Sequence, residues 1–313
     1  MILRRHIREV SVAVVYGLLL ALLAWRNPNF FHRNQFRSTW ISSSPLIVLS
    51  VGMTMVILAR HIDISIGSQF SICAIVAGLL AKAGYSMPMV GLGTLAAGSA
   101  MGAVNGVLVA LLNLPSIVVT LATMVILQQS LSLWRQGEAI VGLPPTFQWF
   151  GLDQSAGQWT VLGISLGVFV IFMIGMRMVP AGRAILAVGS DQEAARLAGV
   201  RPRRVVLVVF VLMGALTGVA AMLRAVRQPT VVANSGLGLE LEVIAAVVVG
   251  GTAISGGRGT LLGSLLGVAL LSTISPALIF LTREPYWDQA IQGGIILLAV
   301  ASDSFQPRPR RTP

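Results

Sequence analysis

Charged side chains are scarce in this sequence. They make up 11% of its 313 residues, whereas 55% are hydrophobic. A soluble domain usually carries about 25% charged residues. So few charges cannot cover the surface of a water-soluble protein of this size. The composition therefore predicts an all-α polytopic membrane protein, in which lipid is part of the solvent.

Lysine and cysteine each occur once. The only lysine, Lys82, lies in LLAKAG, so a Gly-Lys-[Ser/Thr] phosphate loop is absent and the chain cannot hydrolyse ATP by that chemistry. Cys73 excludes an internal disulfide and argues against a cysteine-based metal site. The histidines at positions 6, 32 and 61 lack the spacing of metal ligands, and neither H-E-x-x-H nor G-x-S-x-G occurs. We therefore expect no catalytic residues, no metal and no cofactor.

Apolar runs separated by prolines predict about ten transmembrane helices. The first run, in MILRRHIREVSVAVVYGLLLALLAW, resembles a signal peptide. It lacks a small-x-small cleavage site, so we expect an uncleaved span. The expected spans are 10–25, 41–59, 66–83, 87–112, 116–134, 159–178, 204–223, 238–253, 260–281 and 286–302.

The basic residues predict the orientation. With the N-terminus in the cytoplasm, alternation of ten spans places 14 of the 22 basic residues on the cytoplasmic side, as the positive-inside rule requires. We therefore expect one membrane domain over residues 1–304, a disordered basic tail over 305–313, and both termini in the cytoplasm. The net charge of +11 then needs no nucleic-acid partner.

Glycine recurs at every fourth position in two of the expected spans. Small residues at this spacing share one helix face and let another backbone approach closely. Because the fourth and ninth spans lie five apart, the two copies would run in opposite directions, and we expect an inverted repeat. Such glycine triplets are also common in unrelated membrane helices, so close packing without a repeat stays open. The residues are Gly98, Gly102, Gly106, Gly259, Gly263 and Gly267.

One short polar stretch, VGSDQEAARLAGV at 188–200, interrupts the apolar sequence. Ser190 and Glu193 form S-x-x-E, which predicts a capping box, and Asp191 places negative charge in the first turn. Gly199 and Pro202 predict the helix end. A helix this short is marginal in water and needs a surface to dock on.

The face of this helix that we expect to dock consists of Ala194, Leu197 and Ala198. The flanking arginines place the segment in the cytoplasm. The alternative is a short interfacial helix that lies on the bilayer and separates two spans. That alternative is disfavoured because the segment lacks a large apolar face.

Four stretches resemble a known family. EAARLAG resembles the Glu-Ala-Ala-x-x-x-Gly loop by which bacterial ABC importer permeases dock into their ATPase subunits. RHIDISIGS, GAVNGVLVALLNLPSIVVTLATM and LEVIAAVVVGGTAISGGRGTLLGSLLG resemble permeases of the ribose, rhamnose and autoinducer-2 class, over about residues 45–300. One departure is Arg258 in GGRGT, where a small or apolar residue is expected.

The resemblance implies a multi-pass permease of the bacterial inner membrane that works by alternating access and transports a monosaccharide or a related small polyol-like solute. It implies three partners: cytoplasmic ATPase subunits, an extracytoplasmic substrate-binding protein, and a second permease copy, identical or different. Glu240 and Glu242 begin the eighth span, where they suit a helix N-terminus or could dock the binding protein. The residues implied in ATPase coupling are Ser190, Asp191, Gln192, Glu193, Ala194, Ala195, Leu197 and Gly199.

Two other functions stay open. An ion-coupled secondary transporter commonly uses intramembrane carboxylates, and only Asp63 qualifies. A membrane scaffold without transport would not need the capped cytoplasmic helix.

Polar residues near the inner ends of several spans are candidates for the substrate path. Asp63 and Ser65 either cap the third span or line the path. The others offer the hydroxyl and amide groups that a neutral solute needs, but they serve equally well in hydrogen bonds between helices. They are Asn105, Ser116, Thr120, Thr123 and Gln128.

Overall fold

The computed structural model describes residues 2–26 and 28–282, and the single positions 290, 293–294 and 297. The tenth expected span, 286–302, and the expected tail, 305–313, lie outside the continuously described residues. Within these residues the chain is helical and has no strand. The helices are α1 (Ile2–Arg26), η1 (Pro28–Phe31), α2 (Arg33–Leu58), α3 (Ile66–Lys82), α4 (Met87–Ala110), α5 (Ser116–Arg135), η2 (Gln148–Gly151), α6 (Gln154–Met178), α7 (Pro180–Ser190), α8 (Gln192–Leu197), α9 (Pro202–Ala225), α10 (Leu239–Val249) and α11 (Leu261–Thr282).

Seven of the described helices, α1, α2, α4, α5, α6, α9 and α11, are long and apolar enough to cross a membrane. The expectation of ten full spans needs a correction at the third, 66–83, because α3 is an apolar helix of 17 residues, slightly too short to count as a full span. It needs a larger correction at the eighth, 238–253, because α10 has only 11 residues. At 1.5 Å per residue it covers about 16 Å, roughly half of the hydrocarbon core. Glycines in the left-handed conformation bound it: Gly238 has φ +84° before it and Gly251 has φ +96° after it.

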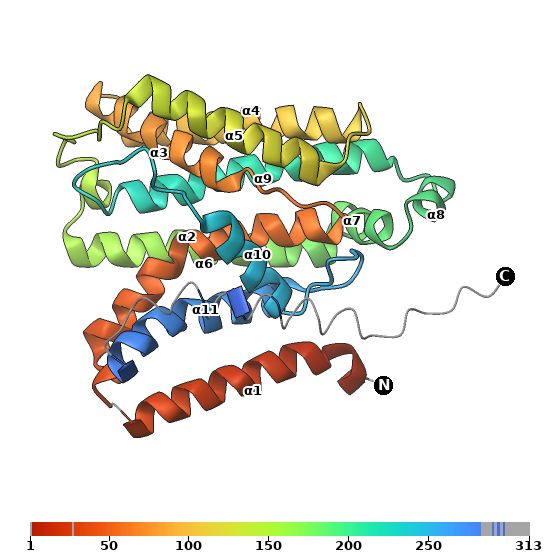
Figure 1. Ribbon diagram of the computed structural model, residues 1–313, viewed down its shortest axis with the longest axis horizontal. Coiled ribbons are helices and arrows are strands. Elements are labelled where there is room, and N and C mark those ends of the chain that lie inside the picture. The colour runs from red at the N-terminus through yellow and green to blue at the C-terminus, as the bar shows by residue number, and fades with distance from the viewer. Residues whose placement is uncertain (1, 27, 283–289, 291–292, 295–296, 298–313) are drawn as a thin grey trace.

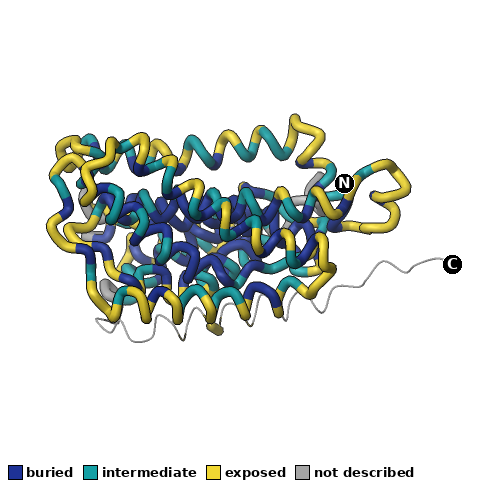
Figure 2. The backbone as a smooth tube through the Cα atoms, turned by 90° about the horizontal axis from the view of Figure 1, so that it is seen from above, coloured by how far each residue is buried: buried dark blue, intermediate teal, exposed yellow. Residues whose placement is uncertain are grey.

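Helix α2 forms the centre of the bundle. Its apolar stretch is 94% buried, and it packs against α9, α11, α6 and α10. Figure 1 shows α4 and α5 on one side of this centre and α1 on the other, where it lies against α11. Figure 2 shows the buried positions gathered in the middle and the exposed ones on the outer helices. The apolar outer faces of α1, α5 and α6 therefore need lipid or another protein to cover them.

The start of α6 illustrates how one side chain extends a helix. Asp153 caps it by accepting hydrogen bonds from the backbone N–H groups of Ser155 (3.1 Å) and Ala156 (3.2 Å). These bonds and the one from the Ser155 hydroxyl hold the pKa of the Asp153 carboxyl below its usual range. The helix consequently starts at Gln154, before the expected residue 159.

The glycines of α4 lie against the backbone of α9. Gly98 faces Gly214, and a Cβ atom on Gly102 would lie 3.1 Å from the Cα atom of Gly214 and overlap the carbonyl oxygen of Phe210. Gly106 meets Leu207 and Phe210. The close approach expected from the spacing is therefore confirmed for this span, and α9 contributes glycines of its own.

The second glycine series meets a different kind of neighbour. Gly263 faces Gly250, at the end of α10, and Gly267 faces Ala246 of that helix. Gly259 lies before α11, with φ +153° and beside Thr252, so its expected place in the helical stripe is wrong.

Replacing Gly102 with alanine should weaken the α4–α9 contact, because the added methyl group has no free space. Overpacking of this kind costs about 1–3 kcal/mol. Gly167→Ala in α6 is the matched control: nothing lies within 4 Å of its Cβ position, and alanine favours a helix by up to about 1 kcal/mol. Thermal unfolding in detergent should rank Gly102→Ala below the parent and Gly167→Ala at or above it. Equal stability of the two variants would contradict the close contact.

Candidate functional site

A short helical hairpin, α7 and α8, projects beyond one end of the bundle (Figure 1). Asp191 caps α8, because its Oδ1 atom accepts hydrogen bonds from the backbone N–H groups of Glu193 (2.9 Å) and Ala194 (3.0 Å). The predicted capping box is wrong: Ser190 is the last residue of α7, and its hydroxyl donates to the carbonyl of Leu186 at 2.8 Å. Glu193 accepts a hydrogen bond from Arg196 (2.6 Å).

The end of α8 follows the prediction from glycine and proline. Gly199 has φ +84°, and Pro202 begins α9. The N–H of Gly199 bonds to the carbonyl of Arg196, and the N–H of Val200 bonds to that of Ala195, each at 3.0 Å. The helix covers six residues, Gln192–Leu197.

One face of α8 is free to contact another protein. Ala194, Leu197 and Ala198 are exposed, and Leu197 is 81% exposed. Ala195 is buried and attaches the helix to the chain. A leucine this exposed on a projecting hairpin has no apolar cover within the described residues.

The base of the hairpin is in backbone contact with the bundle. The N–H of Gly257 donates to the carbonyl of Leu58, the last residue of α2, at 2.9 Å. A Cβ atom on Gly189 would overlap that carbonyl and lie 2.8 Å from the Gly257 nitrogen. Three segments, the ends of α7 and α2 and the loop before α11, therefore meet at one point. Arg258 is exposed in this loop, so the turn accommodates it; its carbonyl accepts from Ala253 at 2.8 Å.

Residues 59–65 enter the bundle without forming a helix. Side chains of a neighbouring helix supply hydrogen-bond partners for the backbone of this segment. The backbone of Ile62 forms two hydrogen bonds with α5, each 3.3 Å long. Its N–H donates to the Ser116 hydroxyl, and its carbonyl accepts from the Thr120 hydroxyl. These hydrogen bonds hold an extended segment between helices.

Asp63 is completely buried two residues before Ser65, the N-cap residue of α3, and no side chain caps this helix. Its Oδ1 atom accepts from the N–H (3.0 Å) and the hydroxyl (2.6 Å) of Ser65. The Ser65 hydroxyl also accepts from the side-chain amides of Gln69 (2.7 Å) and Asn105 (2.8 Å). The structure thus places Asp63, Ser65 and Asn105 in one buried network that ties α3 to α4.

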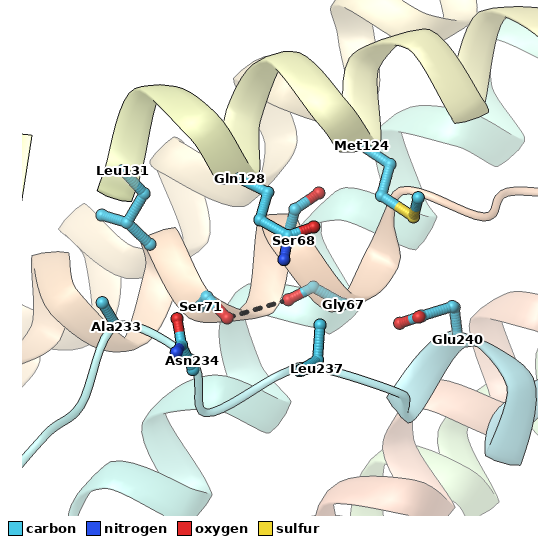
Figure 3. A pocket seen from close by; sticks show the side chains of 10 residues that line it. All are labelled: Gly67, Ser68, Ser71, Met124, Gln128, Leu131, Ala233, Asn234, Leu237 and Glu240. Carbon is cyan, nitrogen blue, oxygen red and sulfur yellow. Dashed lines mark hydrogen bonds between the residues drawn. The ribbon is translucent and has the colours of Figure 1, made fainter. Parts of the chain in front are cut away.

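The starts of α3 and α10 meet inside the bundle. A Cβ atom on Gly236 would lie 2.9 Å from the carbonyl carbon of Gly67. The Ser71 hydroxyl joins the two segments, because it donates to the Gly67 carbonyl (3.1 Å) and accepts from the N–H of Gly236 (3.0 Å). The carboxylate of Glu240, in the first turn of α10, lies against Gly67 (Figure 3).

A small pocket of about 20 Å³, room for about one water molecule, lies at this meeting point. Figure 3 shows α5 above it, with Met124 and Gln128 directed toward the start of α3, and the loop before α10 below it. Its lining combines hydroxyl, amide and carboxylate groups with apolar side chains. The lining residues are Gly67, Ser68, Ser71, Met124, Gln128, Leu131, Ala233, Asn234, Leu237 and Glu240.

Of the expected path residues, only Gln128 lines this pocket. The Thr123 hydroxyl bonds to the Thr120 carbonyl of its own helix (3.2 Å), and the remaining five form the contacts described above. Sequence reasoning missed Ser68, Ser71 and Asn234, and it assigned Glu240 to a helix N-terminus or to docking of the binding protein. No local signal brings these residues together, because they come from separate segments.

The family described as "Branched-chain amino acid transport system / permease component" matches residues 36–300. The chain is 35% identical to the autoinducer 2 import system permease protein LsrC of Enterobacter sp. (strain 638), over 93% of this chain and 83% of the relative. It is 34% identical to the proteins of that name from Escherichia coli (strain K12 / DH10B), with 94% and 85% covered, and Salmonella typhi, with 94% and 84% covered. No solved structure matches the chain.

Asp191→Ala should loosen α8 selectively, since it removes two hydrogen bonds at the helix start. Loss of such a cap costs about 1 kcal/mol, which corresponds to about fivefold faster amide exchange at Glu193 and Ala194. Asp191→Asn keeps a capping oxygen and should exchange like the parent. Ser190→Ala should also leave these two amides unchanged, because Ser190 bonds within α7. Faster exchange in Ser190→Ala than in Asp191→Ala would restore the capping box.

Proposed function

We propose a function from the premise that this chain belongs to the "Branched-chain amino acid transport system / permease component" family. It is a multi-pass membrane protein and a permease component of the ABC importer family that includes the autoinducer 2 permeases. We infer that it imports a monosaccharide or a related small polyol-like solute by alternating access, energised in trans by a separate ATPase. The family description and the relatives' names point to different solutes. The pocket lining has more hydroxyl and amide groups than carboxylates, of which Glu240 is one, and this balance favours a polyol-like solute.

The exposed face of α8 carries this proposal. A short, capped helix that projects from a membrane domain and leaves Leu197 uncovered suits docking into an ATPase subunit. The proposed orientation places the α8 end and both termini in the bacterial cytoplasm, where the positive-inside rule puts Arg196, Arg201, Arg203 and Arg204. An extracytoplasmic binding protein would then deliver the solute at the opposite end.

The contacts between helices support the proposed inverted repeat. Helix α3 packs against α9 and α4, and α10 packs correspondingly against α2 and α11. In the expected order of spans, α2, α3 and α4 are the second, third and fourth, and α9, α10 and α11 are the seventh, eighth and ninth. A shift by five spans therefore converts the α3–α9 and α3–α4 contacts into α10–α2 and α10–α11, and it converts α4–α9 into α11–α2. In such a repeat, α3 and α10 are the two helices that begin inside the membrane, next to the pocket.

In the proposed mechanism, the ATPase moves α8, and the contact at Gly189 transmits the motion. Gly189 meets the end of α2 and the loop before α11, so both helices follow the hairpin. Displacement of α2 and α11 shifts the start of α3, at Gly67, and the segment that leads into α10, at Gly236, which together enclose the pocket. A second permease copy, identical or different, would complete the path across the membrane.

Leu197→Asp should abolish docking, because it replaces an apolar contact with a charge. Loss of a buried leucine costs about 1.5–3 kcal/mol, or about 10- to 100-fold in affinity. Leu152→Asp is the control: Leu152 is 47% exposed but lies beyond the other end of the bundle, after η2. Copurification with the ATPase and ATP-dependent solute uptake should both fall for Leu197→Asp alone.

Retention of the ATPase and of uptake by Leu197→Asp would refute the docking role of α8. Uptake that collapses with a proton ionophore while ATP is held constant would favour the ion-coupled secondary transporter instead.

Gly189→Ala should separate docking from transport. The added methyl group collides with the Leu58 carbonyl, whereas the face of α8 stays unchanged. We expect parental ATPase copurification with uptake reduced about tenfold or more, on the scale of overpacking. Gly175→Ala, at the same end of the bundle in α6, has nothing within 4 Å of its Cβ position and should transport normally. Parental uptake by Gly189→Ala would show that the hairpin transmits motion by another route.

A further inference from the structure

A second cavity, of about 860 Å³, lies outside the proposed solute path. It is a groove between α8, the first turn of α9 and the turn that joins α4 to α5 (residues 111–115). Because α5 begins at Ser116 and α9 at Pro202, the groove lies at the ends of two membrane-crossing helices. Lipid headgroups occupy this level of a bilayer.

The groove has an excess of positive charge. It is lined by Arg196, Arg201, Arg203 and Arg204, and Glu193 is its only acidic residue. Glu193 already pairs with Arg196 at 2.6 Å. Among the described residues, no acid pairs with the other three arginines, and the first turn of α9 contains no acid. An anion with several acceptor oxygens would satisfy them, as phosphate groups do with arginine.

Exposed leucines adjoin the arginines. Leu111, in the lining, is 49% exposed, and its neighbours Leu112 and Leu114 are 60% and 43% exposed. Asn113, also in the lining, has φ +54° and gives the turn its left-handed bend. An acidic protein surface or free phosphate would neutralise the arginines but leave these leucines uncovered. An anionic phospholipid supplies both a phosphate group and hydrocarbon.

We propose that this groove binds one anionic phospholipid. Its phosphate contacts Arg201, Arg203 and Arg204, and an acyl chain covers Leu111 and Leu112. The bound lipid bridges α9 and the α4–α5 turn next to the base of α8. It therefore steadies the hairpin independently of any ATPase.

The test uses the full-length chain in nanodiscs of phosphatidylcholine and phosphatidylglycerol, without an ATPase. Retention of phosphatidylglycerol after delipidation is measured by mass spectrometry. Each basic residue near a lipid surface contributes about 1 kcal/mol, so the double variant Arg203→Gln/Arg204→Gln should bind the anionic lipid about 25-fold more weakly. The control Arg177→Gln/Arg183→Gln removes the same charge from exposed positions of α6 and α7 and should retain it. If the double variant fails to fold, Arg203→Gln alone should give about a fivefold loss.

Three further arms identify the ligand. Leu112→Ser should also lower retention, inorganic phosphate should not displace the lipid, and neutral phosphatidylcholine alone should not be retained. Equal losses in both double variants would show general charge attraction and overturn the site. Displacement by phosphate would make it a phosphate site. Unchanged lipid retention, with ATPase association lost in Arg203→Gln/Arg204→Gln, would assign the arginines to an acidic protein surface and refute the proposal.

Discussion

Direct contact between backbones at glycine is the constraint on which the bundle depends. It joins α4 to α9 at Gly98 and Gly102, and α11 to α10 at Gly263. The same contact brings the starts of α3 and α10 together at Gly67 and Gly236, where the pocket lies. Because lipid is as apolar as the helices, burial of apolar surface does not drive helices together in a membrane. Helices without large side chains between them associate instead through dispersion contacts, and they lose little side-chain entropy.

A second constraint follows from the absence of water in the hydrocarbon core. Non-helical backbone there must find its hydrogen-bond partners within the protein. The segment before α3 meets this requirement through Ser116, Thr120 and the network around Asp63. The segment before α10 meets it through a pair of backbone bonds between Ile140 and Val231 and through the bond from Gly236 to Ser71. Three of the predicted path residues, Asp63, Ser116 and Thr120, therefore contribute hydrogen bonds to the first of these two segments.

Hydropathy and proline positions predict most long helices of this chain to within a few residues, because burial in lipid depends on composition. They do not predict the half-length of α10, because hydropathy does not distinguish Gly250 and Gly251, which follow the last helical residue Val249, from residues that continue a helix. The S-x-x-E pattern at Ser190 predicted the wrong cap, because Asp191, one residue later, accepts the N–H of Glu193 that a Ser190 cap would use. The pocket was beyond sequence reasoning, apart from Gln128, because its lining comes from three segments that only the packing of α3, α5 and α10 brings together.

The contact between the hairpin and the bundle involves the main chain on both sides, at Gly189, Leu58 and Gly257. This contact therefore depends on the backbone conformation and does not involve the side chains of α8. As long as position 189 lacks a Cβ atom, the sequence of 191–198 is free to change with the proposed ATPase partner while the hairpin keeps its attachment. The exposed face of the hairpin and its attachment to the bundle can therefore evolve separately.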